Sequence, residues 1–356
     1  IMAKRSFYVK DSELDDYQVK VINKKTDNSY IVKGCAGSGK SILALWKAKQ
    51  IQEQNKGSYL YVVYTKALKQ YMSDGISQIG LRDGNVANYD ACFMWSRNEE
   101  GQLTRASWKK GSYDYIIVDE AQDFSEEDIE LLKSKSKKAL LVYGDTAQQL
   151  YKFLKDKQTV SMEDIQYFTK FPVEQLVFNH RLPKRIARVA QFLNSESDEL
   201  EERCTDEGSE KPKILEFGSI NEQFEAIAEL IKNKGMEDVG ILFRSNNDVD
   251  EAYDYFSGKG IQVEAKSYRH KDELDFTSDN PKLMTYHSSK GLQFENVFIP
   301  ECTADGPDDR NPLYVAITRT YKSLYIMHSG NLSSFFDAVP TNLYDESLST
   351  GPTLKL

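Results

Sequence analysis

Long apolar segments are missing from this sequence of 356 residues. No run approaches the roughly 20 consecutive apolar residues of a membrane-spanning helix. The first residues, IMAKRSFYVKDSELDD, also lack the apolar stretch of a secretory signal. We therefore expect a cytoplasmic protein that makes no membrane contact.

Cysteine is scarce, and its spacing excludes two kinds of site. The four cysteines are Cys35, Cys92, Cys204 and Cys302, and none belongs to a CxxC pair. Zinc sites and disulfide frameworks need paired or numerous cysteines, so the sequence predicts neither. Isolated thiols are typical of the reducing cytoplasm.

Net positive charge is lacking as well. The formal charge is −9, whereas a protein that coats nucleic acid is usually basic. A local groove on an acidic protein can still hold a strand, so the charge disfavours nucleic-acid binding without excluding it. The length indicates two domains of roughly 150–200 residues each.

What the sequence does contain is a regular alternation of short apolar runs with helical patterns, which is typical of parallel α/β folds. In the first half the predicted strands are 30–33, 59–64, 115–119 and 140–143, and the predicted helices are 41–54, 66–79 and 126–135. In the second half the predicted strands are 213–217, 239–243, 283–286, 297–299 and 323–327, and the predicted helices are 184–193, 221–233, 248–259 and 311–320. The polar stretches 195–211 and 272–280 are expected to be exposed connections. The sequence thus predicts two α/β lobes with parallel sheets, residues 1–170 and 171–356.

The segment GCAGSGKS lies between a predicted strand and a predicted helix. It satisfies the pattern GxxxxGK[ST], in which main-chain N–H groups curl round phosphates and the helix N-terminus adds its dipole. Lys40 is expected to reach the β- and γ-phosphates of a nucleotide, and Ser41 to ligate Mg²⁺. The residues assigned to nucleotide binding here are Gly34, Gly37, Ser38, Gly39, Lys40 and Ser41.

An acidic pair closes another predicted strand of the first half. Asp119 and Glu120 lie in VDEAQD, at the carboxyl edge of a parallel sheet, where ligands bind in such folds. Asp119 suits the Mg²⁺ shell, and Glu120 suits activation of the attacking water. Alone, such a pair is equally compatible with a solvated turn, but the phosphate loop upstream favours the catalytic interpretation.

Three further residues are candidates for catalysis. Gln148, in GDTAQQLY, follows a third strand and can hydrogen-bond the γ-phosphate or the attacking water, with Gln149 as the alternative. Arg181 and Arg319 lie far along the chain, in the second lobe. An arginine aimed at a transferred phosphoryl group is worth about 10³–10⁵ in rate, and one supplied by another lobe makes hydrolysis depend on closure.

Six segments in fixed order resemble the superfamily 1 helicases of the UvrD/Rep type, and the match spans nearly the whole chain. They are GCAGSGKS, VDEAQD, GDTAQQLY, NHR, MTYHSSKGLQFE and LYVAITR. The resemblance implies two RecA-like P-loop NTPase domains, with ATP and Mg²⁺ bound in the cleft between them. Family members are usually much longer, so this chain is similar to a near-minimal two-lobe motor.

In the first lobe the resemblance assigns one contact to the nucleotide base and several to a single strand. It implies that Gln18, within LDDYQVKVI, contacts adenine. The segment VVYTKAL resembles the family's single-strand-binding segment, so that Tyr64 would stack on a base while Thr65 and Lys66 contact the strand backbone. A buried core aromatic is the alternative for Tyr64.

The segment after the third motif carries two more aromatic residues. By resemblance to GDxxQxxY, Gln148 lies at the γ-phosphate and Tyr151 towards DNA. Phe153 stands where larger members have another aromatic, and it is either a base-stacking residue or a core residue.

In the second lobe the resemblance makes Arg181 of NHR and Arg319 of VAITR the two arginine fingers. His180 replaces the aromatic residue that stacks on adenine in the family. Gly291 and Glu295, in MTYHSSKGLQFE, are assigned to the nucleotide, with the glutamate on its sugar.

The same lobe supplies further contacts to nucleic acid. Arg244 and Asn246, in ILFRSN, neighbour the nucleic-acid path in the family, and His287 couples the nucleotide to that path. These assignments follow from the resemblance alone.

Two functions fit these motifs. The first is an ATP-driven translocase or helicase on single-stranded nucleic acid, DNA rather than RNA, with the 3′→5′ polarity that the family associates with VDEAQD. The second is a regulatory ATPase, stimulated by nucleic acid, that works with a partner such as a nuclease subunit in DNA repair or phage defence; the acidic charge favours it. A small-molecule kinase would leave Gln148 and both late arginine segments unexplained.

Overall fold

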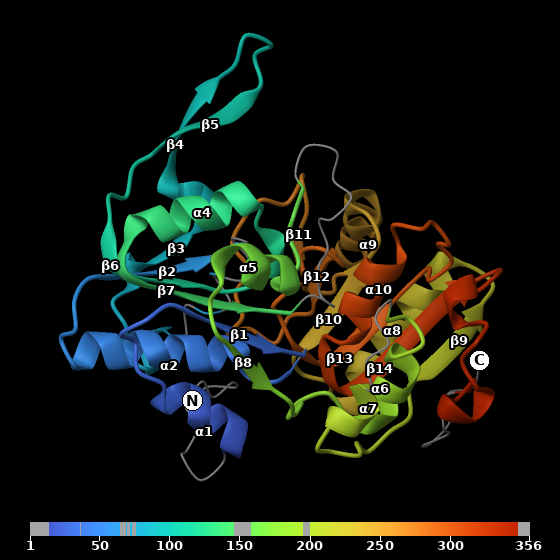
Figure 1. The fold of residues 1–356 in the computed structure, drawn as a ribbon. Helices are drawn as coiled ribbons and strands as arrows, with labels where there is room; N and C mark the ends of the chain where they lie inside the picture. Colours follow the sequence, from blue (N-terminus) through green and yellow to red (C-terminus); the bar gives the residue numbers. More distant parts are fainter. Residues whose placement is uncertain are drawn as a thin grey trace. The chain divides into compact units, whose positions relative to one another are not determined.

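The computed structural model describes residues 14–35, 37–64, 69, 72, 76–145, 158–194 and 200–347. The chain divides into two compact units, Ile1–Asn179 and His180–Leu356 (Figure 1). Each unit contains one six-stranded sheet whose recorded strand pairs are all parallel. The predicted α/β class with two parallel sheets is confirmed.

The sheet of the first unit has the strand order β3-β2-β6-β7-β1-β8. Its strands are β1 (Tyr30–Gly34), β2 (Tyr59–Val63), β3 (Val86–Asn88), β6 (Tyr113–Val118), β7 (Ser136–Gly144) and β8 (Val173–Leu176). The helices described around it are α1 (Asp16–Asn23), α2 (Lys40–Glu53), α4 (Glu126–Lys135) and α5 (Met162–Thr169), with 3₁₀ turns at Asp83–Asn85, Tyr89–Cys92 and Ala121–Asp123.

Helices cover both faces of this sheet, which explains why its central strands are apolar throughout. On one face, Leu60, Ile116 and Leu140 pack with Ile129 of α4 and Ile165 of α5 in a single buried cluster. On the opposite face lies α2 (Figure 1). The helix α4 begins at a capping box between Ser125 and Asp128, which satisfies N–H groups at its first turn.

A two-stranded antiparallel hairpin lies outside the six-stranded sheet of the first unit. It consists of β4 (Phe93–Arg97) and β5 (Leu103–Trp108), with Trp95 opposite Arg105. Figure 1 shows the hairpin standing out from the helices and strands of its own unit. No strand was predicted here, because most residues of both strands are exposed and leave no apolar run.

The sheet of the second unit has the strand order β11-β12-β10-β13-β14-β9. Its strands are β9 (Lys213–Phe217), β10 (Val239–Phe243), β11 (Glu264–Lys266), β12 (Lys282–Thr285), β13 (Phe294–Ile299) and β14 (Thr320–Ser329). The helices described here are α6 (Lys184–Ala190), α7 (Leu200–Arg203), α8 (Ile220–Lys234), α9 (Asn246–Gly258) and α10 (Arg310–Ile317), with 3₁₀ turns at Ser334–Phe336 and Thr341–Leu343. Residues of α8 and α9 share one buried cluster with the strands.

Two sequence predictions differ from the structure in detail. The stretch 195–211, expected to be a loop, contains the short helix α7, because Leu200 and Cys204 are buried. The predicted division at residues 170 and 171 precedes β8, which pairs with β1 of the first sheet. The helix predicted over 66–79 lies largely outside the described residues. Among the helices that are described, none combines the length and apolar character needed to cross a membrane.

Candidate nucleotide site

Strand order brings the phosphate loop and the acidic pair to one edge of the first sheet. The strand β7 pairs with β1 on one side and with β6 on the other, and all three run parallel. Their carboxyl ends therefore lie next to one another, which is where ligands bind in such sheets. The phosphate loop follows β1, Asp145 follows β7, and Asp119 follows β6.

The lysine of the phosphate loop is hydrogen-bonded to main-chain carbonyls of the same loop. Lys40 is only 6% exposed, and its Nζ donates hydrogen bonds of 2.7 Å to the carbonyls of Gly34 and Cys35. Its Nζ also lies 3.9 Å from Oδ2 of Asp145. Gly39, with φ of +84°, adopts the left-handed conformation that favours glycine and immediately precedes the helix α2. The ammonium group is thus buried at the N-terminus of a helix, where a nucleotide phosphate would bind.

The carboxyl group of Asp119 is fully buried, and its surroundings fit a cation. Burial and the neighbouring charge of Glu120 raise the pKa of Asp119 to about 6, although hydrogen bonds from Ser41 and Tyr61 and the charge of Lys40 oppose the rise. The Tyr61 hydroxyl donates to Asp119 Oδ2 over 3.0 Å. Two adjacent carboxylates beside a serine hydroxyl are what a hard divalent cation prefers, so Asp119 and Ser41 could hold Mg²⁺.

The predicted water-activating residue has an unusual main-chain conformation. Glu120 has φ of +54°, a left-handed region in which residues other than glycine are strained. Its carboxylate accepts a hydrogen bond of 2.6 Å from Nε2 of Gln122. Gln122 Oε1 in turn accepts one of 2.9 Å from the main-chain N–H of Asp145. The fully buried Gln122 therefore links the acidic pair to the end of β7. Gln122 belongs to VDEAQD, but its role becomes visible only in the folded chain.

Gln18 reaches the phosphate loop from the helix α1. Its Nε2 donates a hydrogen bond of 3.1 Å to the Ser38 carbonyl, and its Oε1 accepts from the Asp15 main-chain N–H in a capping box. At the other end of α1, Lys47 Nζ donates to the carbonyls of Ile22 and Lys24 over 2.6 and 2.8 Å. The helix that carries Gln18 is thus tied at both ends to the loop and to α2.

In the second unit both predicted arginines donate hydrogen bonds to one short segment, residues 292 and 293. Arg181 Nη1 donates a hydrogen bond of 2.6 Å to Oε1 of Gln293. Arg319, 3% exposed, donates from Nη1 to the Leu292 carbonyl over 3.4 Å and from Nε to the Val315 carbonyl over 2.9 Å. Two residues far apart in the sequence therefore meet at positions 292 and 293.

The other residues assigned to the nucleotide lie around the same segment. Gly291 has φ of +78° and directly precedes it. Glu295 pairs with Lys322 at 2.5 Å, and the His180 side chain is exposed.

The residues assigned to nucleic acid in the second unit lie at the ends of β10 and β12. Arg244 makes a two-pronged ion pair with Asp309, over 2.8 and 3.1 Å, and Asn246 is the first residue of α9. Burial, and then the charge of Lys290, lower the pKa of His287. Since β10 and β12 are adjacent and parallel, these side chains follow the same edge of the sheet.

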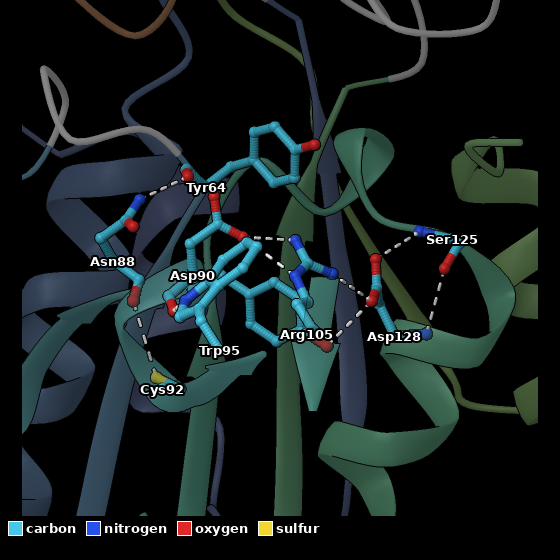
Figure 2. Close-up of polar contacts among 9 residues, drawn as sticks. Tyr64, Asn88, Asp90, Cys92, Trp95, Arg105, Ser125 and Asp128 are labelled. Carbon is cyan, nitrogen blue, oxygen red and sulfur yellow. Dashed lines mark hydrogen bonds and ion pairs between the residues drawn. The ribbon is translucent and has the colours of Figure 1, made fainter. Parts of the chain in front are cut away.

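Tyr64 lies close to Asn88, whose side chain bonds to its carbonyl (Figure 2). Its ring packs edge-on against Phe124 with centroids 5.2 Å apart, and Asn88 Nδ2 donates a hydrogen bond of 2.6 Å to its carbonyl. Burial, and then the charge of Asp123, raise the pKa of its hydroxyl. The ring is only half-buried, so its packing is compatible with both interpretations of the sequence. Thr65, Lys66, Gln148, Tyr151 and Phe153 lie outside the described residues.

Comparison with protein families gives two matches. Residues 18–154 match an AAA domain, and residues 282–327 match a UvrD-like helicase C-terminal domain. The first match contains the phosphate loop and the acidic pair, and the second contains Gly291, Glu295 and Arg319. A comparison with curated proteins found no match.

Similar solved structures include three helicases at low sequence identity. The C-terminal domain of a possible DNA helicase from Lactobacillus plantarum WCFS1 is 16% identical with a TM-score of 0.37, over 47% of this chain and 98% of that one. The Arterivirus nonstructural protein 10 (helicase) is 15% identical with a TM-score of 0.44, over 92% of this chain and 63% of that one. The PRRSV helicase is 17% identical with a TM-score of 0.44, over 87% of this chain and 54% of that one.

The two matched domains indicate the biochemical class of this protein. Helicase domains of this kind indicate an NTP hydrolase, and the AAA domain is the one that binds the nucleoside triphosphate. This chain therefore combines an AAA domain with a UvrD-like helicase C-terminal domain, on two six-stranded parallel sheets.

Proposed function

We propose that this protein is a translocase or helicase that hydrolyses Mg²⁺-ATP and moves 3′→5′ along single-stranded DNA in the cytoplasm. The observation that supports the ATPase most directly is the group at the edge of the first sheet. There the buried Lys40 ammonium and the buried Asp119 carboxyl follow β1 and β6, the two strands that flank β7.

Each residue has a role in this proposal. Lys40 binds the β- and γ-phosphates, and Asp119 and Ser41 hold Mg²⁺, whose charge stabilises the transferred phosphoryl group when it is bound. Glu120 accepts a proton from the attacking water, and Gln122 orients the Glu120 carboxylate through the 2.6 Å hydrogen bond.

The remaining assigned residues act at the two ends of the nucleotide and on the strand. Gln18 contacts the adenine ring, and its amide is already fixed by the bond to the Ser38 carbonyl. Arg181 and Arg319 supply positive charge to the phosphoryl group during transfer. Tyr64 stacks on a base, as aromatic residues do in sequence-independent single-strand binding.

The formal charge of −9 favours a second candidate, a regulatory ATPase whose protein partner, such as a nuclease subunit, performs the useful chemistry. An acidic surface attracts nucleic acid weakly, so a partner would have to supply much of the affinity. Both candidates share the ATP site. They differ in whether the chain alone unwinds a duplex.

The test is the steady-state ATPase rate of the purified chain, alone and with single-stranded DNA, single-stranded RNA or duplex DNA. The translocase predicts strong stimulation by a single strand, abolished by Lys40→Ala. Stimulation by RNA rather than DNA would overturn the choice of substrate. Hydrolysis that none of the nucleic acids changes would favour the partner-dependent ATPase.

A further inference from the structure

The β4–β5 hairpin carries exposed side chains that the nucleotide site does not use. Trp95 is 46% exposed, although tryptophan is usually well buried in soluble proteins. Trp95 and Arg97 are two residues apart on β4, so their side chains leave the same face of the strand. Arg97 Nη1 donates a hydrogen bond of 2.6 Å to the Gly101 carbonyl in the hairpin turn, which keeps its guanidinium beside the hairpin.

Isolated two-stranded hairpins are marginally stable in water, and this one is anchored through Arg105. The guanidinium donates to Asp90 Oδ1 over 3.0 and 2.5 Å and to Asp128 Oδ1 over 3.1 Å. It also lies 4.7 Å from the centroid of the Tyr89 ring. Charge-assisted bonds to a helix residue and to a 3₁₀ turn thus hold the base of the hairpin on the body of the first unit.

Residues 88–90 form hydrogen bonds with both Trp95 and Tyr64 (Figure 2). Asn88 donates to the carbonyl of Tyr64, while two residues later the Asp90 carbonyl accepts a hydrogen bond of 3.2 Å from Trp95 Nε1. The indole ring is therefore fixed by its own N–H, and its face remains partly exposed. An oriented aromatic ring costs little entropy when a partner stacks on it.

The charge of the hairpin differs from that of the whole chain. Residues 93–110 contain four cationic residues, Arg97, Arg105, Lys109 and Lys110, against Glu99 and Glu100, whereas the chain has a formal charge of −9. Arg105 is paired with both Asp90 and Asp128, so the hairpin and these two partners together carry four positive and four negative charges. This neutral part of an otherwise acidic protein therefore repels an anionic strand less than the surface as a whole does.

We propose that Trp95 and Arg97 form a second contact for single-stranded nucleic acid, in which a base stacks on the Trp95 indole and a phosphate binds Arg97. The proposal rests on the proposed function, in which Tyr64 of the same unit makes the first contact with a base of the single strand. Stacking on Trp95 is sequence-independent, and Arg105 acts as a positioning residue that sets the hairpin and hence the ring.

Equilibrium binding of fluorescein-labelled oligo(dT) and oligo(U) to the full chain tests the proposal over a series of salt concentrations. Trp95→Ala is expected to weaken binding roughly 5- to 150-fold, the range measured for loss of one base stack. Arg97→Gln is expected to lower the slope of log K against log salt by about 0.7, as for one lost phosphate contact on a single strand. Tyr167→Ala is the matched control, because Tyr167 is an exposed aromatic of the same unit with Lys170 Nζ 4.1 Å from its ring.

A conservative variant keeps the test independent of folding. Trp95→Phe retains a ring but removes one of only three tryptophans. It should bind oligo(dT) nearly as well as the parent does, and oligo(dT) should quench its tryptophan fluorescence less than that of the parent. If the parent binds a strand and Trp95→Ala binds it equally well, the proposal is overturned and the proposed function stands. If Trp95→Ala instead changes only the sedimentation coefficient, the face is an interface between copies, which also overturns it. A parent that binds neither oligonucleotide removes both proposals.

Discussion

The side chain of Asn179 closes over Gly37 of the phosphate loop. A Cβ built on Gly37 would lie 2.1 Å from Oδ1 of Asn179, which is closer than any real contact. Gly37 also has φ of +76°, and Asn179 is fully buried. Asn179 is the first residue of the NHR segment, which also contains Arg181. This segment therefore packs against the phosphate loop through Asn179.

Gly37→Ala is therefore expected to deform the phosphate loop. The left-handed conformation costs a non-glycine residue about 1–2 kcal/mol, and the contact with Asn179 adds to that. We expect the affinity for a fluorescent ATP analogue to fall at least about tenfold, the equivalent of 1.4 kcal/mol. Gly84→Ala is the control, since a Cβ there meets nothing within 4 Å. Equal nucleotide affinity in the two variants would contradict this role for Asn179.

Glu120→Gln is expected to separate nucleotide binding from hydrolysis. The amide keeps the shape of the carboxylate and can still accept from Gln122, but it cannot take a proton from water. Turnover should fall by about 10²–10⁴, the usual contribution of a general base, while nucleotide affinity is retained. The free energy of unfolding at pH 7 should rise, because the charge of Glu120 is a main cause of the raised pKa of Asp119. Glu130→Gln, an exposed change on α4, is the control, and retained turnover in Glu120→Gln would exclude Glu120 as the base.

Much of the fold could be predicted because its strands are buried on both faces. Runs such as YLYVV in β2 and the YIIV that ends β6 stay apolar through the sheet, so they are visible in the sequence without any knowledge of their neighbours. The strand β8, VEQL, was missed because it carries a glutamate whose burial is supported by Lys20 and Lys24. The hairpin was missed for a different reason. A glycine-containing turn between two runs was present at 98–101, but neither run alternates in polarity.

The phosphate loop and the acidic pair could be predicted because each is a local segment with its own spacing. The link through Gln122 could not, since it joins Glu120 to the main chain of Asp145 only after β6 and β7 have paired. The same limit applies to the arginines. Their motifs mark them as functional, but only the fold brings both of them to residues 292 and 293.

Arg181→Ala and Arg319→Ala are expected to differ in stability although both reduce turnover. Loss of either positive charge should lower the ATPase rate by about 10³ or more, with a smaller effect on nucleotide affinity. Arg319 is buried and donates to the carbonyls of Leu292 and Val315, so its removal should also cost about 1–3 kcal/mol of unfolding free energy. Calorimetry beside the ATPase assay distinguishes the two effects.

Arg185→Ala is the control for the arginine series, because Arg185 on α6 forms a partly exposed ion pair with Glu207. Arg319→Lys retains the charge and part of the hydrogen bonding. Its free energy of unfolding should therefore be close to that of the parent, while its ATPase rate stays reduced. An unchanged ATPase rate in Arg181→Ala would remove this residue from the mechanism.

Lys47 provides a pH-dependent prediction for the helix that carries Gln18. Burial, followed by the charges of Lys56 and Lys24, lowers the pKa of Lys47 to about 8, against about 10.4 for an exposed lysine. Between these two values the unfolded chain binds a proton that the folded chain does not. The contribution of Lys47 to the free energy of unfolding therefore rises with pH across this window and is constant above it.

Lys47→Met should abolish this rise and leave the carbonyls of Ile22 and Lys24 without their donor, at a cost of about 1–3 kcal/mol. Urea unfolding of the parent and the variant at pH 7, 8, 9 and 10 measures the difference, in which the other titrating groups cancel. Lys49→Met is the control, since Lys49 pairs with Glu53 on a more exposed side of α2. We expect the parent to gain stability over Lys47→Met as the pH rises, together with a lower affinity of the variant for ATP because α1 no longer holds Gln18 against Ser38. Parallel stability curves for the two proteins would mean that Lys47 is charged in the folded state over the whole range.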